Sequence, residues 1–198
     1  MPSRAAVITA LAITLVGSLY LLYTPSSATF HMSTSGSAPS GGIPGLEFKL
    51  SQISKDPPSV LVTLKNTHPS TTFTVLKWST PLDPNALNLG VFKLTDVDSK
   101  EEITIDRLMI NRMMPPSRDD LQEISPGTEH ATEVVFDRPW MHSKKPAKYQ
   151  VKAEGEFKAV WEKPAGEITA KELEELFGGG SALNNRQFET EEVVVAVE

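Results

Sequence analysis

The chain of 198 residues contains no cysteine. This excludes disulfide bonds, zinc sites built from thiolates and cysteine nucleophiles. Basic residues are also fewer than acidic ones: there are 19 lysine and arginine residues against 25 aspartate and glutamate residues, which gives a net charge of -6. Because neutralisation of phosphates supplies most of the affinity for nucleic acid, no nucleic-acid partner is expected.

An uncharged apolar run at residues 5–23 follows Arg4 at the N-terminus. The small residues Ser26 and Ala28 then lie where a signal peptidase requires them. We therefore expect a signal peptide over residues 1–28, cleaved between Ala28 and Thr29, and a secreted protein. The alternative is an uncleaved anchor, because the run approaches the roughly 20 residues that cross a bilayer. If the segment is not cleaved, we expect a single-pass membrane protein with an extracytoplasmic domain; otherwise we expect no contact with a membrane.

Serine, glycine and proline dominate the next stretch. Such a composition buries little apolar surface and is typical of a flexible tether. We expect a stalk over residues 29–45 and a folded domain over residues 46–198.

From Leu46 onward, apolar residues recur at every second position, as in half-buried β-strands. The strands are predicted near residues 46–50, 60–64, 73–78, 89–97, 103–105, 133–136, 149–153, 157–161 and 192–197. Turn-forming segments such as Asp56-Pro57-Pro58 and Ser125-Pro126-Gly127 separate them. The pattern predicts an all-β fold, an immunoglobulin-like antiparallel β-sandwich of seven to nine strands.

One segment departs from this period of two. Thr169 and Glu172 have the spacing of a capping box, and apolar residues follow at helical spacing up to Phe177. Glycines come next and are typical of a helix end. A single short helix is therefore predicted near residues 168–177.

No arrangement of residues indicates an active site or a cofactor. The histidines are His31, His68, His130 and His142, and none lies in a His-Glu-x-x-His motif. Glu129, Glu133 and Asp137 lie near two of them in sequence, but without the spacing of metal ligands they are explained equally well as solvated side chains. There is no Gly-x-Ser-x-Gly elbow. We expect no catalytic, metal-binding or cofactor-binding residues, and no enzyme activity.

Two groups of large side chains remain. Trp78 and Trp161 fall in predicted strands, where core packing is the usual role, and Trp140 follows Pro139 in a loop. The run Met109-Ile110-Asn111-Arg112-Met113-Met114 combines methionines with an arginine. Methionines serve adaptable contact surfaces, and they also fill irregular gaps in a core. Arg112, Met113 and Met114 are therefore candidate contacts for a protein partner, with core packing as the alternative.

Several blocks of the chain resemble a known module. They are Val62 to Thr67 with its Asn66-Thr67 end, Val75-Leu76-Lys77-Trp78-Ser79-Thr80-Pro81-Leu82-Asp83, Arg112 with Pro115-Pro116, and the turn Pro126-Gly127. These blocks are similar to the N-terminal β-sandwich of the deuterolysin-type and lysine-specific zinc metallopeptidases. The resemblance covers about residues 57–161.

The sequence differs from that family in one important respect. The sandwich of the family precedes a catalytic domain with a His-Glu-x-x-His helix, and this chain contains no such motif. The resemblance therefore implies no zinc and no peptidase activity. It implies a stand-alone, non-catalytic module of pro-region type that binds or modulates a separate protein, in particular a metallopeptidase. The alternative is a membrane-anchored structural or adhesion domain at the cell surface.

Overall fold

The computed structural model describes residues 41–136, 147–176 and 180–198. These residues form ten strands and three short helical turns. The strands are β1 (Leu46–Lys55), β2 (Pro58–Asn66), β3 (Phe73–Leu76), β4 (Phe92–Asp96), β5 (Leu121–Ile124), β6 (Glu129–Val135), β7 (Ala147–Phe157), β8 (Val160–Trp161), β9 (Arg186–Glu189) and β10 (Val193–Val197). The helical turns are η1 (Arg118–Asp120), η3 (Ala165–Glu167) and α2 (Ala170–Glu174).

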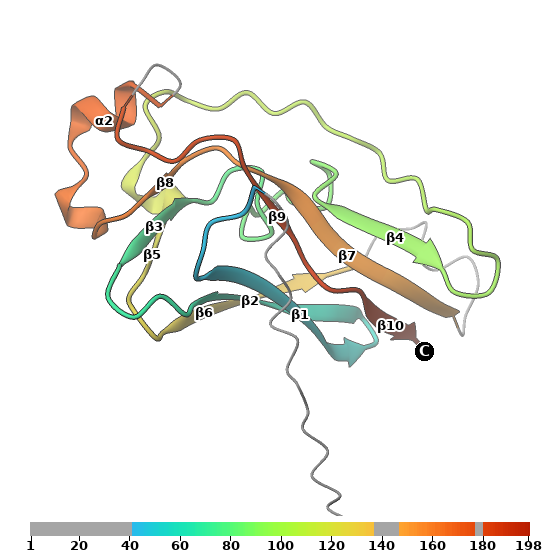
Figure 1. Ribbon diagram of the computed structural model, residues 1–198. Helices are drawn as coiled ribbons and strands as arrows, with labels where there is room; N and C mark the ends of the chain where they lie inside the picture. Colours follow the sequence, from blue (N-terminus) through green and yellow to red (C-terminus); the bar gives the residue numbers. More distant parts are fainter. Residues whose placement is uncertain (1–40, 137–146, 177–179) are drawn as a thin grey trace, which may run out of the picture. The chain divides into compact units, whose positions relative to one another are not determined.

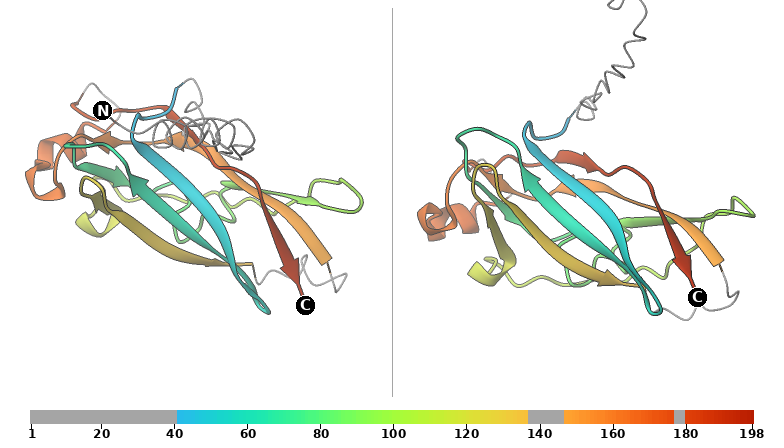
Figure 2. Two further views of the ribbon diagram at one scale, coloured as in Figure 1. Left: turned by 60° about the horizontal axis from the view of Figure 1, so that its bottom comes forward. Right: turned by 90° about the horizontal axis from the view of Figure 1, so that it is seen from below.

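The strands pair antiparallel in three sheets (Figure 1). The first sheet has the order β1-β2-β6, and the second has the order β10-β7-β4, with β9 paired to the end of β7. A small sheet of order β5-β3-β8 follows β2 in the chain and leads back into β6. Figure 2 shows β1, β2 and β6 side by side, with β10 next to β1 at the border of the sheet.

The main core is made by alternate side chains of the two larger sheets. In β2, Val60, Val62 and Leu64 are fully buried, while the residues between them are half-buried. They join Leu94 of β4 and Val151 of β7 in one apolar cluster. Full burial of such a side chain contributes about 1.5–3 kcal/mol. The predicted fold class, an all-β immunoglobulin-like sandwich with one short helix, is confirmed.

The side chain of Gln52 links the edges of the two larger sheets. Its Nε2 donates to the Ala196 carbonyl oxygen at 2.6 Å, and its Oε1 accepts from the Ala196 N–H at 3.0 Å. The pairing of β1 with β2 shifts register between Gln52 and Ser54. One amide therefore satisfies both backbone groups of a β10 residue, which would otherwise face the sheet edge unpaired.

Asn66, part of the resemblance to the peptidase module, lies at the junction between the first sheet and the small sheet. Its buried Nδ2 donates to the carbonyl oxygens of Thr71 at 2.7 Å and Ile124 at 3.0 Å, and its Oδ1 accepts from the His68 N–H at 2.9 Å. The amide thus ties the end of β2 to the start of β3 and the end of β5. The role of this residue is structural.

The strands of the structure differ from the predicted strands in three details. The ten described strands exceed the expected seven to nine, because β5 and β9 were not predicted. Each is four residues long and has few apolar positions, so its own pattern is weak. Residues 103–105 are not a strand: the neighbouring Glu102 forms a single bridge to Thr95, and the Ile103 N–H donates to Leu94.

The predicted helix is shorter than expected. The helical turn η3 and the five-residue helix α2 replace one helix over 168–177. The capping box of Thr169 and Glu172 is present, as its spacing predicted. Ile168, Leu173 and Leu176 are buried in a second apolar cluster with Trp161. Residues 177–179, which include the predicted glycine end, lie outside the described residues.

The domain includes residues that the composition assigned to the stalk. Ile43 is 2 % exposed and belongs to the main core, and the Gly41 carbonyl accepts from the Gln187 N–H at 3.2 Å. One buried isoleucine among serines and glycines is too short a signal to reveal this in the sequence.

The signal peptide with its Ala28–Thr29 cleavage site, and the stalk up to residue 40, lie outside the described residues. Within the described residues, no helix has the length and hydropathy to cross a membrane.

Candidate interaction surface

The loop after β3 is organised by Asp83. Its buried carboxylate accepts hydrogen bonds from the backbone N–H groups of Ser79 and Asn85, both at 2.9 Å. The Thr80 hydroxyl donates at 2.7 Å to a carbonyl oxygen of the same turn. Side chains that bind nearby backbone groups in this way stabilise turns. Residues 78–83, which carry the most specific part of the resemblance, therefore form one internally bonded turn.

Arg112 reaches this turn from a distant part of the chain. Its Nη2 donates to Oδ2 of Asp83, and its guanidinium carbon lies 5.5 Å from the centre of a Trp78 ring. The Asp83 side chain has no exposed surface, and the Arg112 side chain keeps 25 % of its own. A buried carboxylate needs such a partner, because an unpaired charge inside a protein is strongly destabilising. Arg112 therefore anchors its own segment to the turn.

Around Arg112 the chain presents apolar side chains to solvent. Six large apolar side chains are exposed in the described residues, and four of them lie within Leu108–Met114, which we call the exposed segment. Apolar side chains gathered on a surface mark interaction sites more often than single ones do. The exposed fractions are 54 % for Leu108, 103 % for Met109, 88 % for Met113 and 49 % for Met114.

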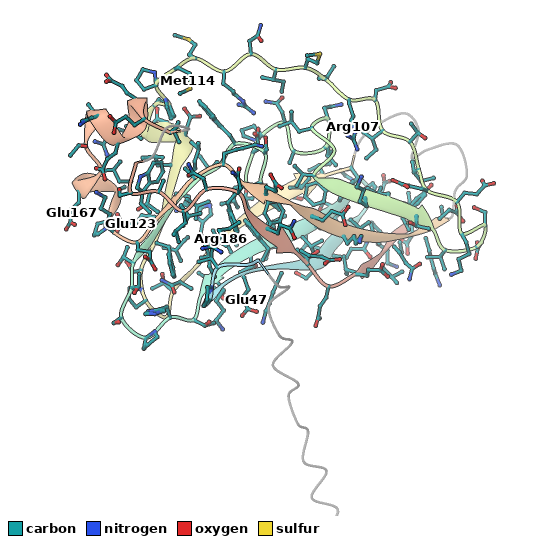
Figure 3. All side chains as sticks on the ribbon, turned by 45° about the horizontal axis from the view of Figure 1, so that its top comes forward. Glu47, Arg107, Met114, Glu123, Glu167 and Arg186 are labelled. Carbon is teal, nitrogen blue, oxygen red and sulfur yellow. The ribbon has the colours of Figure 1, made fainter. Side chains whose placement is uncertain are left out.

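The exposed segment is attached to the domain at both ends. At its start, the Leu108 N–H donates at 2.9 Å to a carbonyl oxygen of the loop before β4. Arg107 lies over Gly90, so close that a Cβ there would be 2.8 Å from the arginine Nε. Beyond its end, Arg118 donates to two carbonyl oxygens in and after η3. Figure 3 labels Arg107 near one end of this run and Met114 at the other.

Between these attachments the backbone is unpaired. Within the described residues, no N–H or carbonyl group of residues 109–114 forms a hydrogen bond with the protein. Figure 1 draws this part as an open run between β4 and β5, outside any strand. Its side chains nevertheless alternate, because Ile110 and Arg112 are half-buried while Met109, Asn111 and Met113 are exposed. These are the features of a strand that has no neighbour.

The structure divides the three candidate contacts that the sequence grouped together. Met113 and Met114 are exposed, so the core-packing alternative does not apply to them. Arg112 instead turns inward to Asp83. Sequence reasoning missed the part of Asp83 as its partner, because nothing local connects the two positions. It also missed Asn111, because the residue types of Met109-Ile110-Asn111-Arg112-Met113 do not alternate between apolar and polar, and only their burial does.

The other polar candidates do not assemble into a site. Within the described residues, no group of three histidine, aspartate or glutamate side chains is placed to hold a metal ion. His130 is half-buried in β6, and burial, together with the positive charge of Lys77, lowers its pKa. The His68 Nδ1 accepts backbone hydrogen bonds from Ser70 and Thr71 in its own loop. His31, Asp137, Trp140 and His142 lie outside the described residues.

Both tryptophans of the predicted strands are buried, as expected for core residues. Trp161 of β8 is 1 % exposed, and Trp78 is 7 % exposed. They belong to the second apolar cluster, beneath α2. Trp78 has an additional part, because its ring faces the Arg112 guanidinium.

Comparison with known proteins agrees with the observed sandwich. A protein of Arthroderma benhamiae described as "Uncharacterized secreted protein" is 36 % identical over 122 residues, which cover 61 % of this chain. The same alignment covers 61 % of the relative, so the match spans about three fifths of its length. Neither this relative nor the family match links the chain to deuterolysin-type peptidases. The model of an immunoglobulin-like domain family matches residues 45–197, and the protein belongs to that family.

Proposed function

We propose that the protein is a secreted, non-catalytic immunoglobulin-like module that binds another protein through its exposed segment. The observation that carries this proposal is the concentration of four of the six exposed large apolar side chains in Leu108–Met114. The Arg112–Asp83 pair supports it, since a fixed segment loses little conformational freedom on binding. The signal-like N-terminus and the secreted relative support an extracellular location.

The partner class that we propose is a separate zinc metallopeptidase of the deuterolysin type. Its basis is the resemblance of residues 57–161 to the sandwich that accompanies those enzymes. Methionine side chains suit such a contact, because they are flexible and adapt to the surface that they meet. We propose no zinc, cofactor or nucleic acid for this module.

The test compares two double variants, each of which replaces two exposed apolar side chains by serine. Met109→Ser with Met113→Ser removes two apolar side chains from the exposed segment. Ile53→Ser with Val194→Ser removes two exposed side chains from β1 and β10. Both variants should keep their free energy of unfolding within about 0.5 kcal/mol, as is usual for exposed positions. Only the first should lose binding.

Binding is measured by biolayer interferometry against a purified deuterolysin-type peptidase, together with the peptidase activity. We expect the dissociation constant to rise at least about tenfold in the first variant, equivalent to about 1.4 kcal/mol. Equal binding by both variants would remove the exposed segment from the proposal. Absence of binding by the unmodified protein would reject the peptidase as partner.

A second proposed function is a structural or adhesion domain anchored at the cell surface. The apolar run of residues 5–23 favours it, because its length approaches that of a membrane span. Expression of the full chain in a secreting host, followed by intact-mass analysis of medium and membranes, separates the two. A product beginning at Thr29 in the medium supports the secreted module, whereas a membrane-bound product that retains Met1 supports the anchored domain.

A further inference from the structure

The outward side chains of the exposed segment have the same order in both directions along the chain. Met109, Asn111 and Met113 face solvent, with Asn111 at the centre. Between them, Ile110 and Arg112 are half-buried, and Arg112 turns inward to Asp83. In an antiparallel strand pair, residues at equal distances from the centre lie opposite each other. A strand with this order is therefore complementary to a second copy of itself.

The pairing follows from the geometry of antiparallel strands. With a two-fold axis at Asn111, each Met109 lies opposite Met113 of the second copy, so apolar side chains meet apolar side chains. The two Asn111 amides lie opposite each other, and each amide can donate to and accept from the other. The unpaired N–H and carbonyl groups of residues 109–114 supply the ladder of hydrogen bonds.

The charges favour contact at this position. The chain has a net charge of -6, so two copies repel each other over most approaches. The exposed segment contains one charged residue, Arg112, and its charge is matched by Asp83 of the same chain. Two exposed segments therefore meet without bringing unmatched charges of like sign together.

The size of the contact sets its strength. A standard interface uses roughly 20–30 residues on each side, and interfaces below about 1,200 Å² of total buried area are weak. The exposed segment supplies only the residues from Leu108 to Met114. The expected dimer is thus transient, populated at high local concentration, as on a crowded surface.

We infer that the exposed segment pairs, antiparallel and about a two-fold axis at Asn111, with the exposed segment of a second copy. This inference rests on the proposed function, because it takes the exposed segment to be the interaction surface, and it names a partner for that surface. Self-pairing occupies the backbone edge of the exposed segment and packs Met109 beside Met113 of the second copy, so it competes with binding of a different protein at the same place.

The absence of cysteine makes a crosslinking test direct, since no native thiol can compete with the introduced ones. In the inferred pair, the two Asn111 Cα atoms lie about 4.5–5.5 Å apart, within the range that a disulfide spans. The two Met109 Cα atoms lie about 14 Å apart, which is too far. The variants are Asn111→Cys, Met109→Cys, the double variant Met109→Cys with Met113→Cys, and Ser99→Cys, an exposed position in the turn after β4.

Each purified variant is exposed to a mild oxidant, and dimers are measured by intact mass and non-reducing electrophoresis. We expect Asn111→Cys and the double variant to form disulfide dimers at least about tenfold faster than the two single controls, because pairing raises the local thiol concentration. Equal rates for all four variants would show random collision and overturn the inference. So would a rate for Asn111→Cys no higher than that of Ser99→Cys while circular dichroism shows a folded protein.

The two proposals fail in different ways. Selective crosslinking without peptidase binding keeps the self-pairing and rejects the peptidase. Peptidase binding that depends on Met109 and Met113, without selective crosslinking, keeps the proposed function and rejects the self-pairing.

Discussion

The strand β2 and the exposed segment share a pattern of alternate inward and outward side chains, yet they differ in every other respect. β2 lies between β1 and β6 and pairs with both. Its inward side chains, such as Val62, are fully buried. The exposed segment has no strand beside it within the described residues, and its attachments include the Leu108 N–H hydrogen bond and the Arg112–Asp83 ion pair.

The difference shows that alternation alone does not determine burial. In β2 the inward face is apolar and the two neighbouring strands satisfy the backbone. In the exposed segment Met109 and Met113 are on the outward face, and the half-buried positions between them include an arginine, Arg112. A strand with its apolar face outward, and with its backbone unpaired, is one that still lacks a partner.

The largest effect is expected in β2 itself. Val62→Asp places a carboxylate without a partner in the main core, where Val62 has no exposed surface, and should abolish folding. Thr63→Asp is the control, because Thr63 points to the other face and pairs with Lys49 of β1. Circular dichroism and urea unfolding compare the two. Similar stability of both variants would mean that β2 does not alternate as described.

Removal of the Arg112 side chain, which attaches the exposed segment to Asp83, is expected to have the next largest effect. Arg112→Met leaves the buried Asp83 carboxylate without its ion pair. The cost should be about 2–3 kcal/mol in the free energy of unfolding, below the value for a fully buried pair because part of Arg112 is exposed. Arg112→Lys keeps the charge but loses the planar contact with Trp78 and should cost less. Urea unfolding at neutral pH measures both, and an Arg112→Met variant as stable as the original would contradict the anchoring.

A smaller effect is expected where the exposed segment begins. Gly90 has a φ of +75°, and Gly127 has a φ of +72°. Alanine at either position should cost about 1–2 kcal/mol, because a Cβ is unfavourable in this backbone conformation. Gly90→Ala should cost more than Gly127→Ala, since its Cβ collides with Arg107 while that of Gly127 meets open space. Thermal unfolding provides the comparison, and an equal cost would show that Arg107 moves freely.

The smallest effect concerns α2, which is held by polar contacts in place of strand pairing. Lys163, followed by Ser181, holds the pKa of the Glu172 carboxyl well below its ordinary value of 4.5. A lowered pKa in the folded state stabilises the protein above 4.5, and this stabilisation is lost as the pH falls below that value. In Glu172→Gln, the free energy of unfolding should therefore fall less steeply as the pH is lowered below 4.5. Urea unfolding at several pH values measures this, and an unchanged pH dependence in the variant would exclude this carboxyl as a cause.

Much of the fold was predictable because its signals are local. The alternation near residues 46–50 and 60–64 predicted strands with one buried face, and the spacing of Thr169 and Glu172 predicted the start of a helix. The strands β5 and β9 were not predictable in this way. Each is short, and each exists because it pairs with a longer partner, β3 or β7. The same limit applied at Ile43, whose burial depends on the sheets around it.

The sequence by itself determined the β-sandwich, because the period of its apolar residues and the position of its turns depend only on near neighbours along the chain. It also marked Arg112, Met113 and Met114 as unusual. Only the tertiary structure decided which of them faces outward. Asp83 and Arg112 are 29 residues apart, and no local pattern connects them. Folding brings the two charges together, because the buried carboxylate needs a partner, and this contact leaves the methionines beside it in solvent.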